Sequence, residues 1–333
     1  MVPVPKNKKI SIERILPSEL SRYGDFVAGA KFKSYAQFPE IPAQSLRELF
    51  FDELEGIKDS SLTIFLAMNK SVPVGILSLH KLNWDTKHFG LPMGKIRHIL
   101  GVMDESGDFE AKQLLVRAAT REFSRMGIRH ISVRLSADDF NAIYALERQK
   151  YYLADTLAEY YFDYRSGLKP RETGHLCRMR LYKDSDFKQV QSSVKDIFKG
   201  YMDRFHRDPN LDQAKADQLY VDWLLNSCKG MAEDVILATV DGQIAGITTL
   251  EVHHKLNAIL PFTVGEVALT GVVPRFRGKK VYTSMINFAQ NYFRGKIDMF
   301  RYATQLENFQ AQKTLMGLGF SLKYAFHTFH YYF

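Results

Sequence analysis

The sequence predicts an α+β protein made of two similar domains, each with a sheet flanked by helices. Apolar residues alternate between the spacing typical of strands and that typical of helices along the whole chain. The order of these patterns is repeated in the second half, and a length of 333 residues exceeds one typical domain. We therefore predict domains at 1–165 and 176–333. They are joined by a linker at 166–175 that contains Gly, Pro and charge but no periodicity.

The first domain is predicted to begin with two helices and a β-hairpin, after which strands and helices alternate. The predicted helices lie at 11–30, 43–57, 111–127 and 139–150, and the predicted strands at 62–69, 73–82, 94–103, 130–136 and 156–165.

The second domain is predicted to follow the same order. Strands are expected early in 177–198 and at 234–240, 243–252, 267–273, 298–305 and 324–333, and helices late in 177–198, at 213–228, from 280 onward and at 308–318. Asp241 and Gly242 are typical of a tight turn between the second and third of these strands.

The two halves also share residues at nearly constant offsets. Phe140 corresponds to Phe309 at an offset of 169 (309 − 140), and Gly75 corresponds to Gly246 at an offset of 171 (246 − 75). Two similar offsets at such different places in the chain indicate duplication of one domain.

Charge and cysteine content limit the partners that we expect. The formal net charge of +8 suits anionic ligands, but the basic residues are scattered rather than concentrated as in a nucleic-acid-binding protein. Two cysteines, Cys177 and Cys228, are too few for a disulfide framework, and no metal-ligand spacing is present. The sequence has neither an apolar signal segment nor a membrane-spanning run, so we expect a cytoplasmic protein without metal, nucleic-acid or membrane partners.

The segment from Val267 to Phe293 predicts an anion-binding site. A half-buried strand is followed by Pro274, which ends strand pairing, and then by a turn containing Arg277 and Gly278. Helical spacing begins near Lys280. A strand, a basic glycine-containing turn and a helix together offer backbone N–H groups, a helix dipole and cations to a phosphate.

This segment, GVVPRFRGKKVYTSMI, resembles the acetyl-CoA motif V-x-P-x-x-R-G-x-G-x-G/A of the GNAT acyltransferase superfamily. Lys280 and Tyr282 depart from the small residues of the motif. The residues that match are Val272, Pro274, Arg277 and Gly278.

Three further segments extend the resemblance. Residues 303–320 resemble the GNAT motif N-x-x-A-x-x-x-Y-x-x-x-G-F, matching at Asn308, Ala311, Gly319 and Phe320 but with Leu315 in place of the tyrosine. Residues 204–230 and 82–96 are similar to segments of TDP-fucosamine acetyltransferase and related sugar-nucleotide N-acetyltransferases. The resemblance implies two tandem GNAT-like domains, each with a mixed, mostly antiparallel sheet, and acetyl-CoA or another acyl-CoA as co-substrate.

The resemblance places the cofactor in the second domain. The corresponding turn of the first domain contains Asp104, Glu105, Asp108 and Glu110, whose negative charge would repel a diphosphate. The first domain is therefore expected to be a degenerate copy. The cofactor-binding residues implied by the motifs are Gly271, Val272, Val273, Arg277, Gly278, Lys279, Lys280, Val281, Tyr282 and Asn308.

The resemblance also implies a general acid and a general base. The GNAT tyrosine protonates the leaving thiolate, and because leucine at 315 cannot do so, Tyr282, with Tyr324 and Tyr331 as alternatives, is the candidate replacement. Glu266 and His253 are the candidates for the base that deprotonates the amine.

We therefore predict a CoA-dependent N-acyltransferase, most simply an acetyltransferase, which transfers its acyl group by direct attack of a small-molecule amine on the thioester. A nucleotide-linked amino sugar is the first expectation for the acceptor, with Arg204, His206 and Arg207 binding its anionic part. The alternatives are another amine, such as an amino acid, polyamine or antibiotic, and a non-catalytic CoA-binding scaffold. A homodimer is compatible with the sequence.

Overall fold

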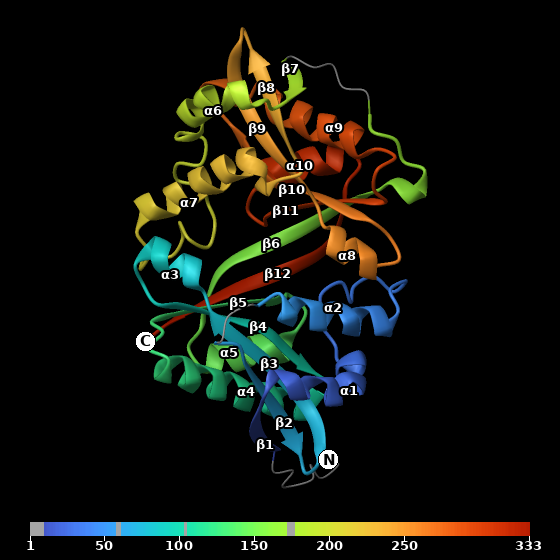
Figure 1. The fold of residues 1–333 in the computed structure, drawn as a ribbon, viewed down its shortest axis with the longest axis vertical. Coiled ribbons are helices and arrows are strands. Elements are labelled where there is room, and N and C mark those ends of the chain that lie inside the picture. The colour runs from blue at the N-terminus through green and yellow to red at the C-terminus, as the bar shows by residue number, and fades with distance from the viewer. Residues whose placement is uncertain (1–9, 58–60, 103–104, 172–176) are drawn as a thin grey trace. The chain divides into compact units, whose positions relative to one another are not determined.

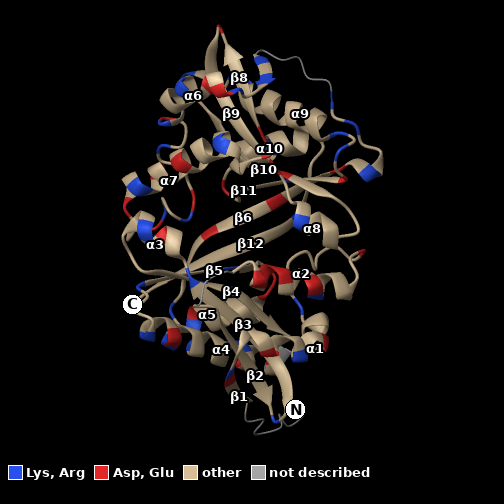
Figure 2. Ribbon diagram, in the orientation of Figure 1, with Lys and Arg blue, Asp and Glu red and all other residues tan. Residues whose placement is uncertain are grey.

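The computed structural model describes residues 10–57, 61–102, 105–171 and 177–333, with the backbone alone at residues 105 and 106. These residues form two compact α/β units (Figure 1). The first unit contains residues up to Ala154 and the chain end Phe326–Phe333, and the second contains Asp155–Ala325. In Figure 2, Lys and Arg lie on many elements and are interspersed with Asp and Glu.

The sheet of the first unit has the strand order β1-β2-β3-β4-β5-β12, and only the β4–β5 pair is parallel. Its central helix α4 packs on β2, β3 and β4 through an apolar core that includes Leu115 and Phe123. The elements before β12 are β1 Ile10–Ile15, α1 Gly24–Gly29, α2 Ala43–Glu55, β2 Thr63–Asn69, β3 Val72–Lys81, α3 Asn83–Phe89, β4 Met93–Gly101, α4 Glu105–Arg125, β5 His130–Ser136 and α5 Phe140–Arg148.

The sheet of the second unit has the order β7-β8-β9-β10-β11-β6, again with a single parallel pair, β10–β11. Helix α9 packs on β8, β9 and β10. The elements are β6 Tyr152–Asp163, β7 Arg178–Leu181, α6 Phe187–Val194, α7 Gln213–Asn226, β8 Asp234–Val240, β9 Gln243–Val252, α8 His254–Ile259, β10 Val264–Val272, α9 Val281–Phe293, β11 Met299–Gln305, α10 Phe309–Gly317 and β12 Ser321–Tyr332.

Each unit completes its sheet with a strand from the other half of the chain. Strand β6 follows the first-half elements in sequence, but its residues 157–163 pair with β11 of the second unit. Strand β12 ends the chain, and its residues 326–332 pair with β5 of the first unit. The compact units therefore do not coincide with the predicted segments 1–165 and 176–333.

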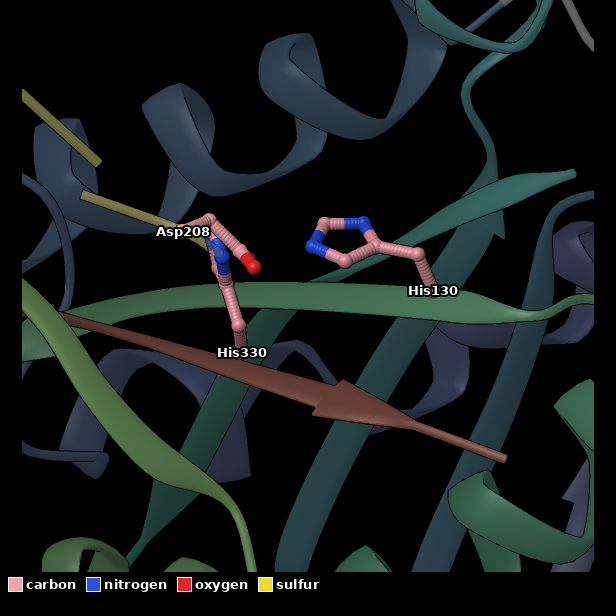
Figure 3. A group of neighbouring side chains, drawn as sticks. All are labelled: His130, Asp208 and His330. Atoms are coloured by element: carbon pink, nitrogen blue, oxygen red, sulfur yellow. The ribbon is translucent and has the colours of Figure 1, made fainter. Parts of the chain in front are cut away.

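The exchanged end of β12 contributes to the core of the first unit. His330 on β12 and His130 on β5 are both fully buried, and their rings meet edge to face with centroids 4.5 Å apart (Figure 3). Phe329 belongs to the same apolar core as Val133 of β5. Phe329 of β12 therefore completes part of the apolar core of the first unit.

Most predicted elements are present, including the helix that begins after Lys280 and the hairpin turn at Asp241-Gly242, where both residues have positive φ. The prediction of a helix from residue 11 was wrong, because 10–15 form β1, which buries Ile10 and Ile15 and pairs with β2. Helices α3 and α8 were not predicted. Asp104, the side chain of Glu105 and linker residues 172–175 lie outside the described residues.

No helix within the described ranges combines the length and the apolar character that a bilayer span requires.

Candidate functional site

The candidate site is a cavity of about 630 Å³ in the second unit, formed where two parallel strands separate. Strands β10 and β11 pair from Val264–Met299 to Val267–Tyr302. Beyond that point Thr270 and Gln305 line the cavity from the two strands. On its other side, β10 has a bulge between Val267 and Thr270 in its pairing with β9. The separation of β10 from β11 and the bulge thus create an opening in the sheet beside Thr270.

One end of the cavity is the basic turn before α9. Gly278, Lys280 and Val281 line it, and Gly278 and Lys280 have φ of 78° and 58°. The hydrogen-bond ladder of α9 begins with the N–H of Ser284 donating to the Lys280 carbonyl at 3.0 Å. The N–H groups of the helical residues before Ser284 therefore lie outside the hydrogen-bond ladder of α9, as at any helix N-terminus.

Arg277 connects this turn to the opposite wall of the cavity. Its Nη2 donates to the Ile197 carbonyl at 3.0 Å and its Nε to the Val272 carbonyl at 3.3 Å. Ile197 and Val272 both line the cavity, as does Arg277 itself. The guanidinium thus fixes the wall, and its remaining N–H groups stay available to a ligand.

Two cations beside Arg277, the predicted Lys279 and Arg275, have other contacts. Lys279 lies over the Phe276 ring, with Nζ 5.6 Å from its centroid. Arg275 donates to Gln243 Oε1 at 2.9 Å. Neither Arg275 nor Lys279 is among the lining residues, and nor is Val273, whose N–H donates to Ala245 in the sheet.

Gly271 is a position of close approach. A Cβ atom there would lie 1.9 Å from Cγ2 of Ile197 and 3.2 Å from Phe198. Only glycine therefore lets the segment after α6 pack against β10 at the cavity.

Asn308 lies at the start of α10 and lines the cavity. Its Oδ1 accepts a hydrogen bond from the N–H of Ala311 at 3.3 Å, while its Nδ2 donates to Thr304 Oγ1 at 3.0 Å. It therefore caps the helix from within the cavity wall.

Three tyrosines converge where the strands separate. The Tyr201 hydroxyl donates to Gln305 Oε1 at 2.7 Å. Tyr282 packs edge to face on Tyr302, with centroids 6.3 Å apart. Burial, together with the neighbouring phenols, raises the pKa of Tyr282 well above its ordinary value, and burial likewise raises the pKa of Tyr201 and Tyr302. All three are therefore neutral O–H groups at physiological pH.

The other two predicted acid candidates lie elsewhere. Tyr324 on β12 is half-buried and is not among the lining residues. Tyr331 belongs to the first unit, where its ring packs 4.8 Å from that of Tyr151. Leu315 is fully buried in the core between α9, α10 and the sheet.

The predicted base residues contact each other. His253 Nε2 lies 2.8 Å from Glu266 Oε1, and Arg301 Nη1 lies 2.9 Å from Glu266 Oε2. Burial raises the pKa of Glu266, but Arg301 and His253 outweigh it, so that the pKa is below its ordinary value. The hydrogen bond and charge of Glu266 raise the pKa of His253. Glu266 is thus a permanent carboxylate that orients a titrating imidazole.

This pair lies outside the cavity lining. Glu266 precedes Thr270 by four residues on β10, a separation of roughly 13 Å along an extended strand. The partly exposed residues of β10 alternate regularly and include Glu266, Ala268 and Thr270. Glu266 therefore lies on the same strand as Thr270 but beyond direct hydrogen-bond reach of it.

The predicted acceptor-binding residues have protein partners. The side chain of His206 is only 6% exposed, with Nδ1 2.9 Å from Asp203 Oδ1 and Nε2 3.0 Å from Asp217 Oδ1. Arg207 pairs with Glu307 at 2.7 Å, and Arg204 stacks on Phe205 at 4.2 Å. His206 thereby anchors the segment that carries Tyr201 into the cavity.

The equivalent place in the first unit is filled by its own side chains. Gly101 ends β4 at an offset of 170 from Gly271 (271 − 101), and a Cβ there would lie 1.8 Å from Asp108 Oδ1. Asp108 turns inward to Lys112, at 2.8 Å, and Lys112 also contacts Asp139 at 2.7 Å. A buried ion-pair network thus packs against Gly101, at the position where Ile197 packs against Gly271 in the second unit.

Sequence reasoning missed Tyr201, Gln305 and the wall formed by Ile197 and Phe198. Tyr201 lies three residues before Arg204, at the edge of the segment that the resemblance singled out. Gln305 ends a predicted strand. Tyr201 and Gln305 belong to no recognisable sequence motif, because they come together only when the chain folds.

Comparisons with known proteins bear on the fold. No sequence model of a known protein family matches the chain, and no curated protein matches it. Among solved structures, a GCN5-related N-acetyltransferase (GNAT) from Sphaerobacter thermophilus is similar with a TM-score of 0.64, covering 97% of this chain and 95% of its own, at 12% identity.

Two further structures agree. A tandem GNAT protein from the clavulanic acid biosynthesis pathway has a TM-score of 0.56, with 97% of this chain and 98% of its own covered at 12% identity. A GNAT-family acetyltransferase from Colwellia psychrerythraea has a TM-score of 0.52, with 97% and 99% covered at 11% identity. The chain therefore has the predicted fold of two tandem GNAT-like α+β domains, each with a mixed, mostly antiparallel sheet.

Proposed function

We propose that the protein is an acyl-CoA-dependent N-acyltransferase with one active site, in the second unit. The observation that carries the proposal is the cavity where β10 and β11 separate, which ends at a cationic turn and the N-terminus of α9. An elongated cofactor with a diphosphate in its middle fits an opening that is polar and cationic at one end and reaches between strands at the other. The buried Asp108–Lys112–Asp139 network at the equivalent place in the first unit supports a single cofactor site.

The residues divide the work of acyl transfer. Backbone N–H groups from Gly278 to Tyr282, with Arg277 and Lys280, bind the diphosphate. Strand β10 after its bulge offers backbone groups to the pantetheine arm and the thioester carbonyl. His253, oriented by Glu266 and outside the cavity lining, receives through water the proton that the amine loses as the C–N bond forms.

The acceptor that we propose first is a nucleotide-linked amino sugar, and this rests on the sequence resemblance of residues 204–230. His206 and Arg207 contact carboxylates within the second unit. Arg204, the third of the residues predicted to bind the acceptor, instead contacts the ring of Phe205. Because two of the three predicted acceptor-binding residues already have partners in the protein, other small amines are tested together with the nucleotide-linked amino sugar.

The first experiment is calorimetric titration of the full chain with acetyl-CoA and with CoA, followed by detection of released thiol with a panel of amines. We expect micromolar binding and turnover with at least one amine. Absence of binding would overturn the proposal. Binding without turnover across nucleotide amino sugars, amino acids, polyamines and aminoglycosides would instead support a CoA-binding scaffold.

A further inference from the structure

A second cavity of the second unit, with a volume of about 470 Å³, lies away from the candidate site. It is formed by the turn after α9 and by the segment that follows β6. Thr263 and Asp298, which immediately precede β10 and β11, also line it. The candidate site opens where these two parallel strands separate, so the second cavity lies at their opposite ends.

Basic side chains outnumber acidic ones in this cavity. The basic residues of its lining, which define what is referred to here as the basic pocket, are Arg165, Lys169, Arg294 and Lys296. Asp298 is the single acidic residue of the lining, and its Oδ2 already accepts hydrogen bonds from the N–H and the hydroxyl of Thr263, both at 2.8 Å. The pocket therefore has an excess of positive charge.

Two of the four cations are engaged by protein groups. Arg165 Nη2 lies 2.9 Å from Asp163 Oδ2, and the guanidinium also lies over the Phe262 ring, 4.8 Å from its centroid. The Lys296 ammonium lies over the Tyr292 ring, 3.5 Å from its centroid. These contacts fix two sides of the pocket and leave the recognition of a ligand to the other two cations.

Lys169 and Arg294 are the cations that a ligand can engage. Both are exposed, and neither forms an ion pair within the described part of the chain. Burial raises the pKa of Tyr164, and the charge of Arg294 opposes this rise, which places the guanidinium near another residue of the lining. Two like charges that line one cavity repel each other, and an anion bound between them removes that repulsion.

The backbone turns of the pocket leave room for a ligand. Gly167 and Gly295 both line it, with φ of 78° and 74°, values that glycine adopts without strain. A Cβ atom at either position would meet nothing within 4 Å. Both turns are therefore open on the side where a side chain would stand.

We propose that the basic pocket is a second anion site, which binds a phosphate group between Arg294 and Lys169. A phosphate monoester carries a charge of about −1.5 to −2 at pH 7 and has three acceptor oxygens, so it can accept from a guanidinium and an ammonium at once. The volume of about 470 Å³ is within the range of small-molecule sites, which leaves room for the group that carries the phosphate. The inference does not depend on acyl transfer.

This site is separate from the cofactor turn. Helix α9 begins at the basic turn and ends at the basic pocket, and its 13 residues span roughly 20 Å. One diphosphate cannot occupy both places, so a ligand of the basic pocket binds together with CoA rather than in competition with it. A bound phosphate would also join the segment after β6 to the turn after α9, and so restrain both.

The test is calorimetric titration of the full chain with inorganic phosphate and with adenosine monophosphate, both at saturating CoA so that the basic turn is occupied. We expect binding of phosphate under these conditions, with slower backbone hydrogen exchange at residues 164–169 and 294–298. Tighter binding of adenosine monophosphate would identify a phosphorylated molecule as the source of the group, and equal affinities would identify free phosphate. Arg294→Gln should weaken binding about tenfold, the scale of one charge-assisted contact, and Lys169→Gln by a smaller factor.

Arg178→Gln is the matched control. It removes the same charge from an exposed position on β7, four strands from β11 and roughly 19 Å away across the sheet. Its affinity for phosphate should equal that of the wild type. Because Arg178, Lys169 and Arg294 are all exposed, none of the three substitutions should change the thermal midpoint.

The outcomes separate this inference from the proposed function. Failure of both anions to bind at saturating CoA would overturn the second site, as would equal losses in Arg294→Gln and Arg178→Gln, which describe a general effect of net charge. If the wild type does not bind CoA, the proposed function fails, and the anions are then titrated into Arg277→Ala, in which the basic turn has lost its arginine. Binding that this variant retains and that Arg294→Gln weakens would support the second site alone.

Discussion

Arg277 brings a positive charge to the turn and also hydrogen-bonds the cavity wall. A substitution of the nearby Arg275 distinguishes the effect of charge from the effect of position. Arg277→Ala should weaken CoA binding by about 1–3 kcal/mol, because it removes a charge-assisted contact and releases the Ile197 carbonyl. Arg275→Ala removes the same charge two residues away, where the side chain donates to Gln243 instead. Calorimetric affinities for both variants check the prediction, and equal losses would reduce the role of Arg277 to general electrostatics.

His253 sets the expected pH dependence of turnover. Its hydrogen bond with Glu266 raises its pKa above the ordinary value of 6.5, and only the neutral imidazole can accept a proton. We expect kcat/KM to rise with pH through a midpoint above 6.5, and His253→Gln to lose this rise. A profile that is unchanged in His253→Gln would show that the proton leaves by another route.

Gly271 tests the close packing of the cavity wall. In Gly271→Ala the new methyl group would overlap Cγ2 of Ile197, so the wall must move. We expect a loss of about 1–3 kcal/mol in the free energy of unfolding, together with weaker CoA binding. Gly317→Ala on α10 is the control, since a Cβ there meets nothing within 4 Å. If both variants unfold alike in denaturant, the close approach has no energetic consequence.

At the level of elements, the sequence predicted what local pattern controls. Helix α9 was located because its apolar residues recur at helical spacing after a glycine-containing basic turn, and the β8–β9 hairpin because Asp241-Gly242 favours a tight turn. Strand β1 was missed because its extended conformation depends on pairing with β2, more than fifty residues later. The separation of β10 from β11 and the placement of Tyr201 against Gln305 also depend on long-range contacts.

The two units share the same order of elements but differ in the side chains at the end of the central strand. At the end of the central strand, Asp108 packs against Gly101 in the first unit, whereas Ile197 packs against Gly271 in the second, where Gly271 also lines the cavity. The acidic turn was predicted to repel a diphosphate, whereas the structure shows that Asp108 points inward and is neutralised by Lys112. The sequence thus predicted the negative charge of this turn, but it did not predict that the Asp108 side chain points into the first unit.

For the whole molecule, the exchanged strands predict that the halves cannot fold separately. A fragment of residues 1–169 contains β6 without β11 and leaves the edge of β5 unpaired, while residues 170–333 have the converse defect. Unpaired strand edges expose backbone groups and apolar faces, and the buried His130 and Phe329 contacts would be lost. Each fragment alone should therefore be poorly soluble and lack cooperative unfolding.

The two fragments produced together should assemble with one-to-one stoichiometry and recover the thermal midpoint of the intact chain to within a few degrees. The control is the full chain with a protease site at residues 168–169, which after cleavage should elute as one species in size-exclusion chromatography. Independent cooperative unfolding of both isolated fragments would contradict the exchange. It would mean that each half completes its sheet with its own last strand, as a simple duplication of one domain would.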